Sequence, residues 1–552
     1  MTKKVVIIGG VAGGASTAAR LRRLNEEMEI VLLEKGEHIS YANCGLPYYI
    51  GEVIKERDEL FVMTPQKFHA WFNVDIKVNC EAIIIDRSAQ QVEVLNHLTG
   101  EKYRESYDFL VLSPGAEPIR PLLPGIDNPA IFTLRNVSDT DRIYNFIRDK
   151  KPTAAVVVGG GFVGLELCEN LKIRGIEVTL VEMASQVLPF LDKEMAAQVE
   201  RNLRKQGVTL YLGDGVSGFE EGNSGGVTVN LQSGSVIQAD LVFISIGVRP
   251  EVSLAREAGL EVGKGIRVNE FLQTTDPKIY ALGDAVEVVD YVTGSPVIIP
   301  LAGPASKQGR IVANNLTGRR ETYGGTQGTA VLKVFDIIVA GTGVNERNLK
   351  QAGLEYKHCI VQPNSHAGYY PDSKTIILKL LFSPEGKIYG AQAVGYGGVE
   401  KRIDVIATAL RSGKNVYDLQ ALELAYAPPF SSAKDPVNMA GYVAGNILQG
   451  DVKTINCDEL AALKEGIKVV DVREPWEYEL GHIPGAVNIP LGQLRRRINE
   501  LHPEEELVVN CAVGLRSYIA VRILMQKGFT KVRNLNGGYN IYQAWTESVM
   551  KS

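Results

Sequence analysis

The sequence predicts an α/β protein built around two β-α-β units that each bind a nucleotide. Each unit starts with a run of aliphatic residues, at 5–8 and at 155–158, that ends in a glycine-rich turn. A predicted helix and a second strand follow each turn, and the second strand ends in Glu34 or Glu182. The predicted fold class is therefore α/β with two Rossmann-like dinucleotide-binding domains. A chain of 552 residues is too long for one hydrophobic core, so further domains are expected.

Composition and charge exclude several classes of function. Hydrophobic residues make up 45% and charged residues 22%, as in ordinary globular proteins. The net charge of -5 provides no field for a polyanion, so no nucleic-acid partner is expected. The first apolar run, 5–8, is too short for a signal sequence or a membrane span, which predicts a cytoplasmic protein without a membrane partner. The six cysteines show neither a CxxC pair nor metal-ligand spacing, so no metal site is expected.

The first nucleotide-binding unit combines a strand at 5–8, a glycine turn at 9–14 and a helix to about Leu24. Glu34 lies twenty positions after Gly14, the spacing at which a carboxylate reaches a ribose hydroxyl while the helix N-terminus holds a pyrophosphate. The middle glycine of the usual G-x-G-x-x-G pattern is replaced by Val11.

The second unit carries the complete glycine pattern, at Gly159, Gly161 and Gly164. Its second strand, 177–181, ends in Glu182. A carboxylate there accepts a hydrogen bond from a ribose 2′-hydroxyl and repels a 2′-phosphate, so the unit is predicted to prefer NADH over NADPH.

Cys44 is the candidate redox residue of the first unit. It lies in the stretch Ser40-Tyr41-Ala42-Asn43-Cys44-Gly45-Leu46-Pro47-Tyr48. Gly45 and Pro47 interrupt any long helix, which predicts a turn or a helix start at Cys44. A redox thiol has to be a thiolate, accessible and close to an electron source.

Three further strand ends complete the pattern: the stretches 107–116 and 240–250 each close on a glycine turn, and Asp284 follows a third strand. With the two nucleotide-binding units they resemble the flavoprotein disulfide reductases over residues 1–445. The resemblance implies FAD on the first unit, with Asp284 at the ribityl chain, and NAD(P)H on the second. The cofactor-binding residues that it implies are Gly9, Gly10, Ala12, Gly13, Gly14, Glu34, Lys35, Ala82, Ser113, Pro114, Gly115, Gly159, Gly161, Gly164, Glu182, Gly247, Gly283, Asp284 and Ala302.

Many of these reductases carry a second cysteine five positions after the first, where this chain has Tyr49. An internal disulfide across this stretch is therefore impossible. The oxidised form of Cys44 is then a mixed disulfide with a small thiol, a persulfide or a sulfenic acid.

The stretch 326–446 reads as an antiparallel segment followed by helices, which is the dimer-forming domain in the resembled family. The runs 366–371 and 426–430, taken with 40–48, resemble coenzyme A-disulfide reductases and NADH-dependent persulfide reductases. This resemblance implies a homodimer in which Tyr369 and Tyr426 of one subunit lie near Cys44 of the other. The coenzyme A-binding residues that it implies are Ser16, Arg20, Arg23, Ser40, Asn43 and Lys434.

The last hundred residues contain four motifs, at 469–474, 481–490, 511–517 and 537–539, that resemble an α/β rhodanese domain. A strand at 507–510 delivers Cys511 to a short loop that contains Gly514, Arg516 and Ser517. Backbone N–H groups, Arg516 and a helix N-terminus can hold an anionic sulfur on Cys511. A cysteine phosphatase would use a similar loop, but the residues at 481–486 favour sulfur transfer.

The predicted domains are an FAD domain (1–150 and 245–325), an NAD(H) domain (151–244), an α+β dimerisation domain (326–446) and a rhodanese domain (454–552). The predicted function is NADH- and FAD-dependent reduction of coenzyme A persulfide, polysulfide or disulfide through Cys44. In this scheme Cys511 relays sulfane sulfur, and coenzyme A is a substrate or a tightly held carrier.

Two alternatives remain open at this point. An NADH oxidase or peroxidase would cycle Cys44 through a sulfenic acid, but peroxide-reducing relatives carry a histidine where this chain has Ala12. A flavin-binding sulfur sensor is the other alternative, although complete cofactor fingerprints favour turnover.

Overall fold

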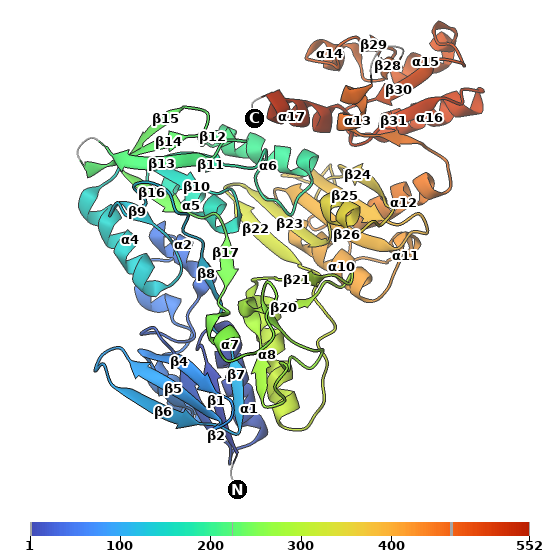
Figure 1. Ribbon diagram of the computed structural model, residues 1–552. Coiled ribbons are helices and arrows are strands. Elements are labelled where there is room, and N and C mark those ends of the chain that lie inside the picture. The colour runs from blue at the N-terminus through green and yellow to red at the C-terminus, as the bar shows by residue number, and fades with distance from the viewer. Residues whose placement is uncertain (1–2, 223–224, 464–466, 551–552) are drawn as a thin grey trace. The chain divides into compact units, whose positions relative to one another are not determined.

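The computed structural model describes residues 3–222, 225–463 and 467–550. The chain folds into two compact units, one made of 1–180 and 215–326 and the other of 181–214 and 327–552 (Figure 1). Among the helices of the described residues, none is both long and apolar enough to cross a membrane.

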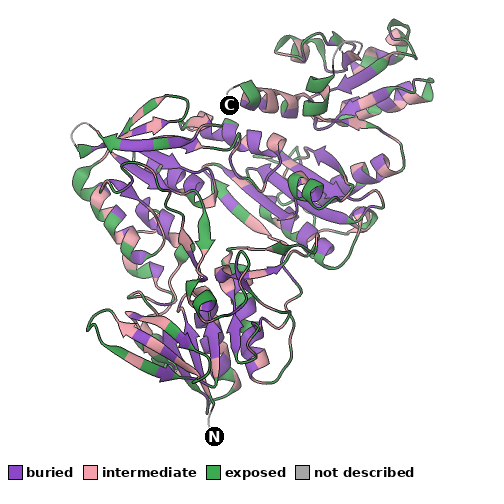
Figure 2. Ribbon diagram, viewed as in Figure 1, coloured by how far each residue is buried: buried purple, intermediate pink, exposed green. Residues whose placement is uncertain are grey.

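The first unit is built on a parallel sheet that confirms the predicted β-α-β start. The order of its strands is β19 (Ile279–Ala281), β7 (Phe109–Leu112), β1 (Lys4–Ile8), β2 (Glu29–Leu33) and β3 (Asp75–Lys77). β1, β2 and β7 are almost entirely buried, as Figure 2 shows in purple, which explains their uninterrupted aliphatic sequences. An antiparallel sheet of β4 (Cys80–Asp86), β5 (Gln91–Asn96) and β6 (Lys102–Ser106) packs against one face through shared core residues.

The first unit also contains the start of the second β-α-β element. β10 (Ala154–Val158) runs parallel to β16 (Leu241–Ile244), which runs parallel to β9 (Ile131–Phe132). An antiparallel sheet of β13 (Val216–Glu221), β14 (Val227–Leu231) and β15 (Val236–Ala239) lies in the same unit. The larger helices of the unit are α1 (Ala12–Leu24), α3 (Pro65–Phe72), α4 (Val137–Lys150), α5 (Phe162–Ile173) and α8 (Ala302–Leu316), and the shorter ones are α2 (Leu46–Ile50) and α7 (Ser253–Glu257).

The two glycine turns have the same backbone geometry. Gly9 has φ +95° and Gly159 has φ +110°, a region that side-chain-bearing residues rarely adopt. A Cβ on Gly9 would lie 2.0 Å from the carbonyl oxygen of Ser113, and one on Gly159 would lie 2.2 Å from that of Ser245. Only glycine therefore fits at these two positions, because a side chain would collide with the backbone that follows the neighbouring strand.

Helices α1 and α8 pack directly on each other, although they are almost 300 residues apart in the sequence (Figure 1). Gly309 makes this contact possible, because a Cβ there would lie 2.6 Å from the carbonyl oxygen of Gly13. The pairing brings the first glycine turn beside the N-terminal half of α8.

The second unit contains an antiparallel sheet and helices, as predicted for 326–446. The order of the sheet is β22 (Ala330–Val334), β23 (Ile337–Gly343), β26 (Ile388–Gly395), β25 (Ile376–Phe382) and β24 (Lys357–Val361). The helices are α9 (Glu346–Gln351), α10 (Val399–Arg411), α11 (Val416–Ala421) and α12 (Pro436–Leu448). The same unit contains α6 (Lys193–Lys205) and β12 (Thr209–Leu212), and β11 (Glu177–Glu182) ends in it.

The last part of the second unit, the C-terminal module, has a parallel sheet of its own. The strand order is β27 (Thr454–Ile455), β31 (Val532–Leu535), β30 (Glu506–Asn510), β28 (Ile467–Asp471) and β29 (Val487–Asn488). The helices are α13 (Cys457–Ala462), α14 (Pro475–Glu479), α15 (Leu491–Arg497), α16 (Leu515–Gln526) and α17 (Gly538–Met550).

The C-terminal module is attached to the rest of its unit by specific contacts. The side-chain oxygen of Asn536 accepts the Ile360 N–H at 2.9 Å, and the Gln362 amide donates to the Gly537 carbonyl at 2.5 Å. Ile360 also belongs to the hydrophobic core of the module. On another face, the Ser548 hydroxyl donates to Glu200 of α6 at 2.6 Å. The module is therefore docked on the antiparallel sheet and α6.

Candidate functional sites

A cavity of about 200 Å³ in the first unit collects most of the residues predicted to bind FAD. It lies at the C-terminal ends of the parallel strands, where ligands bind in such sheets. The predicted residues that line it are Gly9, Ala12, Gly13, Glu34, Lys35, Ser113, Pro114, Gly115, Gly283, Asp284 and Ala302. Asn43 and Cys44 line the same cavity. The structure thus places the candidate redox thiol beside the first nucleotide-binding turn.

The residues of this cavity fit a dinucleotide. The first turn of α1 has no acidic side chain, and its N-cap, Val11, makes no capping hydrogen bond, so N–H groups at this helix start are available to a pyrophosphate. The Glu34 carboxylate accepts the N–H groups of Gly10 and Gly36, each at 2.8 Å, and is thereby fixed at the end of β2. Burial raises the pKa of Asp284, with Arg135 opposing the shift.

Four other predicted cofactor-binding residues of the first unit are not among the residues that line this cavity. Gly10 donates its N–H to Glu34, and Gly14 packs against the Gly9 carbonyl. Ala82 lies on β4, packed against the core, and Gly247 forms the turn before β17 (Val248–Pro250) with φ +106°.

The second glycine pattern lies between β10 and α5, with Gly164 packed on the carbonyl of Gly159. Glu182 is the last residue of β11, and its carboxylate accepts the N–H of Ala184 at 2.7 Å. NADH binding at these residues stays a prediction.

Cys44 lies in a 3-10 turn, Asn43–Gly45, directly before α2, as Gly45 and Pro47 predicted. It is exposed, whereas the other five cysteines are buried. Although Cys44 is accessible, the surrounding protein removes part of the water from its thiol. This desolvation, followed by the carboxylates of Glu166 and Asp284, raises the pKa of the thiol and disfavours the thiolate. The fold therefore makes the Cys44 thiol accessible, but the side chains of Glu166 and Asp284 do not stabilise its thiolate.

This environment predicts how alkylation of Cys44 depends on pH in protein freed of flavin. We expect the rate of iodoacetamide modification to rise through a pKa above the value of about 8.5 for a free cysteine. Replacing Glu166 with Gln removes one of the carboxylates that raise this pKa, so alkylation at pH 8 should become about threefold faster. Mass spectrometry of the Cys44 peptide measures the rate.

Glu27→Gln is the matched control for this experiment, since Glu27 is exposed in the turn that follows α1. A midpoint at or below about 8.5 in the parent protein, or equal midpoints in the parent and Glu166→Gln, would contradict the electrostatic account.

A separate cleft of about 510 Å³ runs along α1 and brings together four predicted coenzyme A-binding residues, Ser16, Arg20, Arg23 and Ser40. Val11, Ala12 and Tyr41 line both this cleft and the FAD cavity, so the two adjoin. Apolar residues form another part of its wall: Val62, Met63, Phe68 and Phe72.

Sequence reasoning missed Arg310 and Ser306 of α8, which line the same cleft. Desolvation, followed by the charges of Arg310, Arg319 and Arg23, lowers the pKa of Arg20. The neighbouring arginines together produce a positive electrostatic potential in the cleft, which suits a ligand with several phosphates.

Tyr369 and Tyr426, both exposed, lie in the second unit with their hydroxyl oxygens 3.1 Å apart. This hydrogen bond raises the pKa of Tyr369. Lys434 is exposed two residues before α12. The structure therefore pairs the two tyrosines, and their position beside Cys44 of a second subunit stays a prediction.

Cys511 is fully buried at the end of β30, where the strand was predicted to deliver it. Its sulfur accepts the Gly514 N–H at 3.1 Å and the Ser517 hydroxyl at 3.4 Å. Gly514 is the N-cap of α16 with φ +101°, so the sulfur lies at the positive end of a helix. Arg516 forms a bidentate ion pair with Glu477 at 2.6 and 2.7 Å, a partner that the sequence analysis did not identify.

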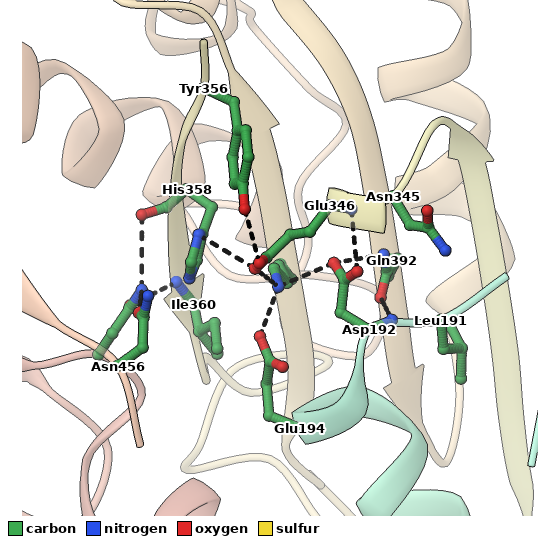
Figure 3. A network of polar contacts seen from close by, with 12 residues as sticks. Leu191, Asp192, Glu194, Asn345, Glu346, Tyr356, His358, Ile360, Gln392 and Asn456 are labelled. Atoms are coloured by element: carbon green, nitrogen blue, oxygen red, sulfur yellow. Dashed lines mark hydrogen bonds and ion pairs between the residues drawn. The ribbon is translucent and has the colours of Figure 1, made fainter. Parts of the chain in front are cut away.

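A buried charged network connects parts of the second unit that are far apart in the sequence. Lys379 of β25 is fully buried, and its Nζ lies 2.8 Å from Asp192 and 2.5 Å from Glu194 and from Glu346, whose carboxylates converge in Figure 3. Burial alone would lower the pKa of Lys379, but these carboxylates outweigh it and raise the pKa. The ligand atoms of Glu194, Glu346 and His358 lie within 4.8 Å of one another, a metal-like spacing in which the Lys379 ammonium supplies the positive charge.

Three protein-family models match the chain in sequence. Residues 3–309 match the pyridine nucleotide-disulphide oxidoreductases, residues 329–436 match the dimerisation domain of these enzymes, and residues 456–545 match the rhodanese-like domain.

Similar proteins agree with these matches. A coenzyme A disulfide reductase of Staphylococcus epidermidis is 37% identical over 80% of this chain and 99% of its own. A protein named NADH oxidase, from Methanocaldococcus jannaschii, is 35% identical over 79% of this chain and 97% of its own. Among solved structures, reduced Bacillus anthracis CoADR-RHD has a TM-score of 0.97 and 52% identity, covering 99% of both chains. A NAD-dependent persulfide reductase from A. fulgidus has a TM-score of 0.92 and 38% identity, covering 98% of this chain and 100% of its own.

Proposed function

Because the chain belongs to the pyridine nucleotide-disulphide oxidoreductases and ends in a rhodanese-like domain, we propose that it is an NADH- and FAD-dependent reductase of coenzyme A persulfide, polysulfide and coenzyme A disulfide. One observation carries the proposal. Cys44 is exposed in the cavity of the first nucleotide-binding turn, and this cavity adjoins a cleft lined by Arg20, Arg23 and Arg310. A thiol at that position would lie beside both a flavin bound in the cavity and a coenzyme A derivative bound in the cleft.

The residues around the first cavity divide the work of holding FAD. The N-terminus of α1 would hold the pyrophosphate, Glu34 would accept a hydrogen bond from the adenosine ribose, and Asp284 would bind the ribityl chain. Bound there, FAD supplies the passage of an electron pair from NADH to a sulfur beside it.

Cys44 performs the sulfur chemistry. Its thiolate attacks the outer sulfur of coenzyme A persulfide, which forms a Cys44–sulfur bond and breaks the S–S bond to coenzyme A. The coenzyme A thiolate leaves with the electron pair of the broken bond. Two electrons that NADH provides then cleave the Cys44 persulfide, which returns the Cys44 thiolate and releases hydrosulfide. With coenzyme A disulfide, the same attack gives a Cys44–coenzyme A mixed disulfide, and its cleavage releases a second coenzyme A thiolate.

The cleft on α1 orients the substrate for this attack. Arg20, Arg23 and Arg310 bind phosphate groups, while Phe68 and Phe72 provide an apolar wall for an adenine ring or the pantetheine arm. In a homodimer, Tyr369 and Tyr426 of the second subunit donate a hydrogen bond to the leaving thiolate. Cys511 carries sulfane sulfur as a persulfide and supplies it to a thiol acceptor.

The test is steady-state NADH oxidation with coenzyme A persulfide, polysulfide, coenzyme A disulfide and oxygen as separate acceptors. We expect kcat/KM to be highest for coenzyme A persulfide and lowest for oxygen, because the basic cleft recognises the phosphates of the carrier. Oxygen or peroxide as the best acceptor would refute the proposal and support an oxidase, the activity in the name of the M. jannaschii relative.

A further inference from the structure

The basic residue of the Cys511 loop is paired with a carboxylate from α14. Arg516 is the single basic residue between Cys511 and Ser517. Both carboxylate oxygens of Glu477 accept N–H groups of its guanidinium, and one of them also accepts the N–H of Glu474, which fixes Glu477 in place. The cation of the loop is therefore matched by a carboxylate that the fold holds rigidly.

The next guanidinium is neutralised in the same way. Arg473 lies 4.2 Å from the ring of Tyr539, whose N–H donates to the Cys511 carbonyl. It forms hydrogen bonds of 2.7 to 3.0 Å with Asp471. Both arginines around the loop thus have carboxylate partners. The Cys511 sulfur accepts from Gly514 and Ser517 at the N-terminus of α16, and it also interacts with the Arg516 guanidinium, whose charge Glu477 balances.

The chain neighbours of the ion pair are apolar and exposed. Trp476 precedes Glu477 and is 63% exposed, while Leu515 precedes Arg516 and is 58% exposed. A small dianion such as thiosulfate would be repelled by the Glu477 carboxylate. Both arginines around the loop already pair with carboxylates, so neither offsets this repulsion in full. An uncharged organic chain would meet apolar surface and no opposing charge.

We propose that Glu477 is a specificity-determining residue of the Cys511 site, and that it selects persulfides of uncharged organic thiols over small sulfur anions. The inference rests on the proposed function only in taking Cys511 as a sulfur acceptor. The Cys511 thiolate attacks the outer sulfur of R–S–SH, a Cys511–sulfur bond forms, and the S–S bond to R breaks. The electron pair leaves on R–S⁻, which takes a proton from solvent, so that no oxidant or reductant is needed.

The experiment measures persulfide loading of Cys511 in the full chain with Cys44→Ser, so that the reductase branch is silent. Intact mass reports the gain of one sulfur atom over time, with pantetheine persulfide or thiosulfate as the donor. The variants are Glu477→Gln, which removes the charge, and Glu477→Asp, which keeps it. Glu479→Gln is the matched control, since Glu479 is exposed on the same helix.

With Glu477 present, loading from pantetheine persulfide should be at least about tenfold faster than from thiosulfate. Glu477→Gln should accelerate thiosulfate loading about tenfold and change pantetheine persulfide loading less than about twofold. Glu477→Asp and Glu479→Gln should keep the original preference. A parallel loss with both donors in Glu477→Gln, or a preference for thiosulfate in the parent chain, would overturn the inference. Failure of every donor to load Cys511, with NADH oxidation intact in the Cys44 enzyme, would refute the relay itself.

Discussion

Replacing Cys44 with serine is expected to reduce NADH oxidation with every sulfur acceptor by at least about a thousandfold. Tyr49 stands where a second cysteine would be, and the other five cysteines are buried, so no thiol in the same segment replaces the lost nucleophile. Steady-state absorbance of NADH at matched flavin content measures the loss, and the flavin spectrum shows that the cofactor is still bound.

Cys511→Ser is the companion variant for this experiment. Coenzyme A disulfide reduction should be unchanged in it, because the proposed mechanism of that reaction uses Cys44 alone. Only substrates that depend on sulfur loading at Cys511 should turn over more slowly. Coenzyme A disulfide reduction that survives Cys44→Ser would remove the basis of the proposed mechanism.

Replacing Lys379 with methionine should have the largest effect on stability. The side chain is fully buried among Asp192, Glu194 and Glu346, so its removal leaves carboxylates without a counter-charge. Breaking a buried charge cluster in this way costs about 3–5 kcal/mol. Hydrogen exchange of the β25 amides reports the local opening free energy, which is better defined than one midpoint for a chain of several domains.

Lys357→Met on the neighbouring strand β24 is the control, since Lys357 is exposed. The double variant Lys379→Met with Glu346→Gln should recover part of the loss, because it removes one unpaired charge. Unchanged protection of β25 in Lys379→Met would show that the network contributes nothing to stability.

The parts of the fold that depend on neighbouring residues could be predicted from the sequence. The turns at Gly9 and Gly159 could be predicted because a positive φ requires glycine, and glycines directly after an aliphatic run are visible in the sequence. The turn at Cys44 followed from Gly45 and Pro47, and the delivery of Cys511 followed from the apolar strand before it.

The parts that depend on distant residues could not be predicted in this way. Arg310 enters the basic cleft only because Gly309 lets α8 approach α1, and no local pattern encodes that packing. Glu477 meets Arg516 across 39 positions. The sequence does contain one indication of the Lys379 network. A lysine within the apolar run 376–382 is costly to bury, so it indicates that acidic partners lie nearby. This indication does not identify Asp192 and Glu346 as the partners.

The docking of the C-terminal module has a consequence for how sulfur is delivered. Ile360 is shared with the core of the module, and hydrogen bonds of Asn536 and Gln362 hold the turn before α17. At the start of that helix, the Tyr539 N–H donates a hydrogen bond to the Cys511 carbonyl. These contacts fix the module on the antiparallel sheet of its own unit, so in the proposed relay we expect a small-molecule thiol to carry the sulfur away from Cys511. An engineer who exchanges this module between relatives would have to transplant the matching surface of β24 and α6 along with it.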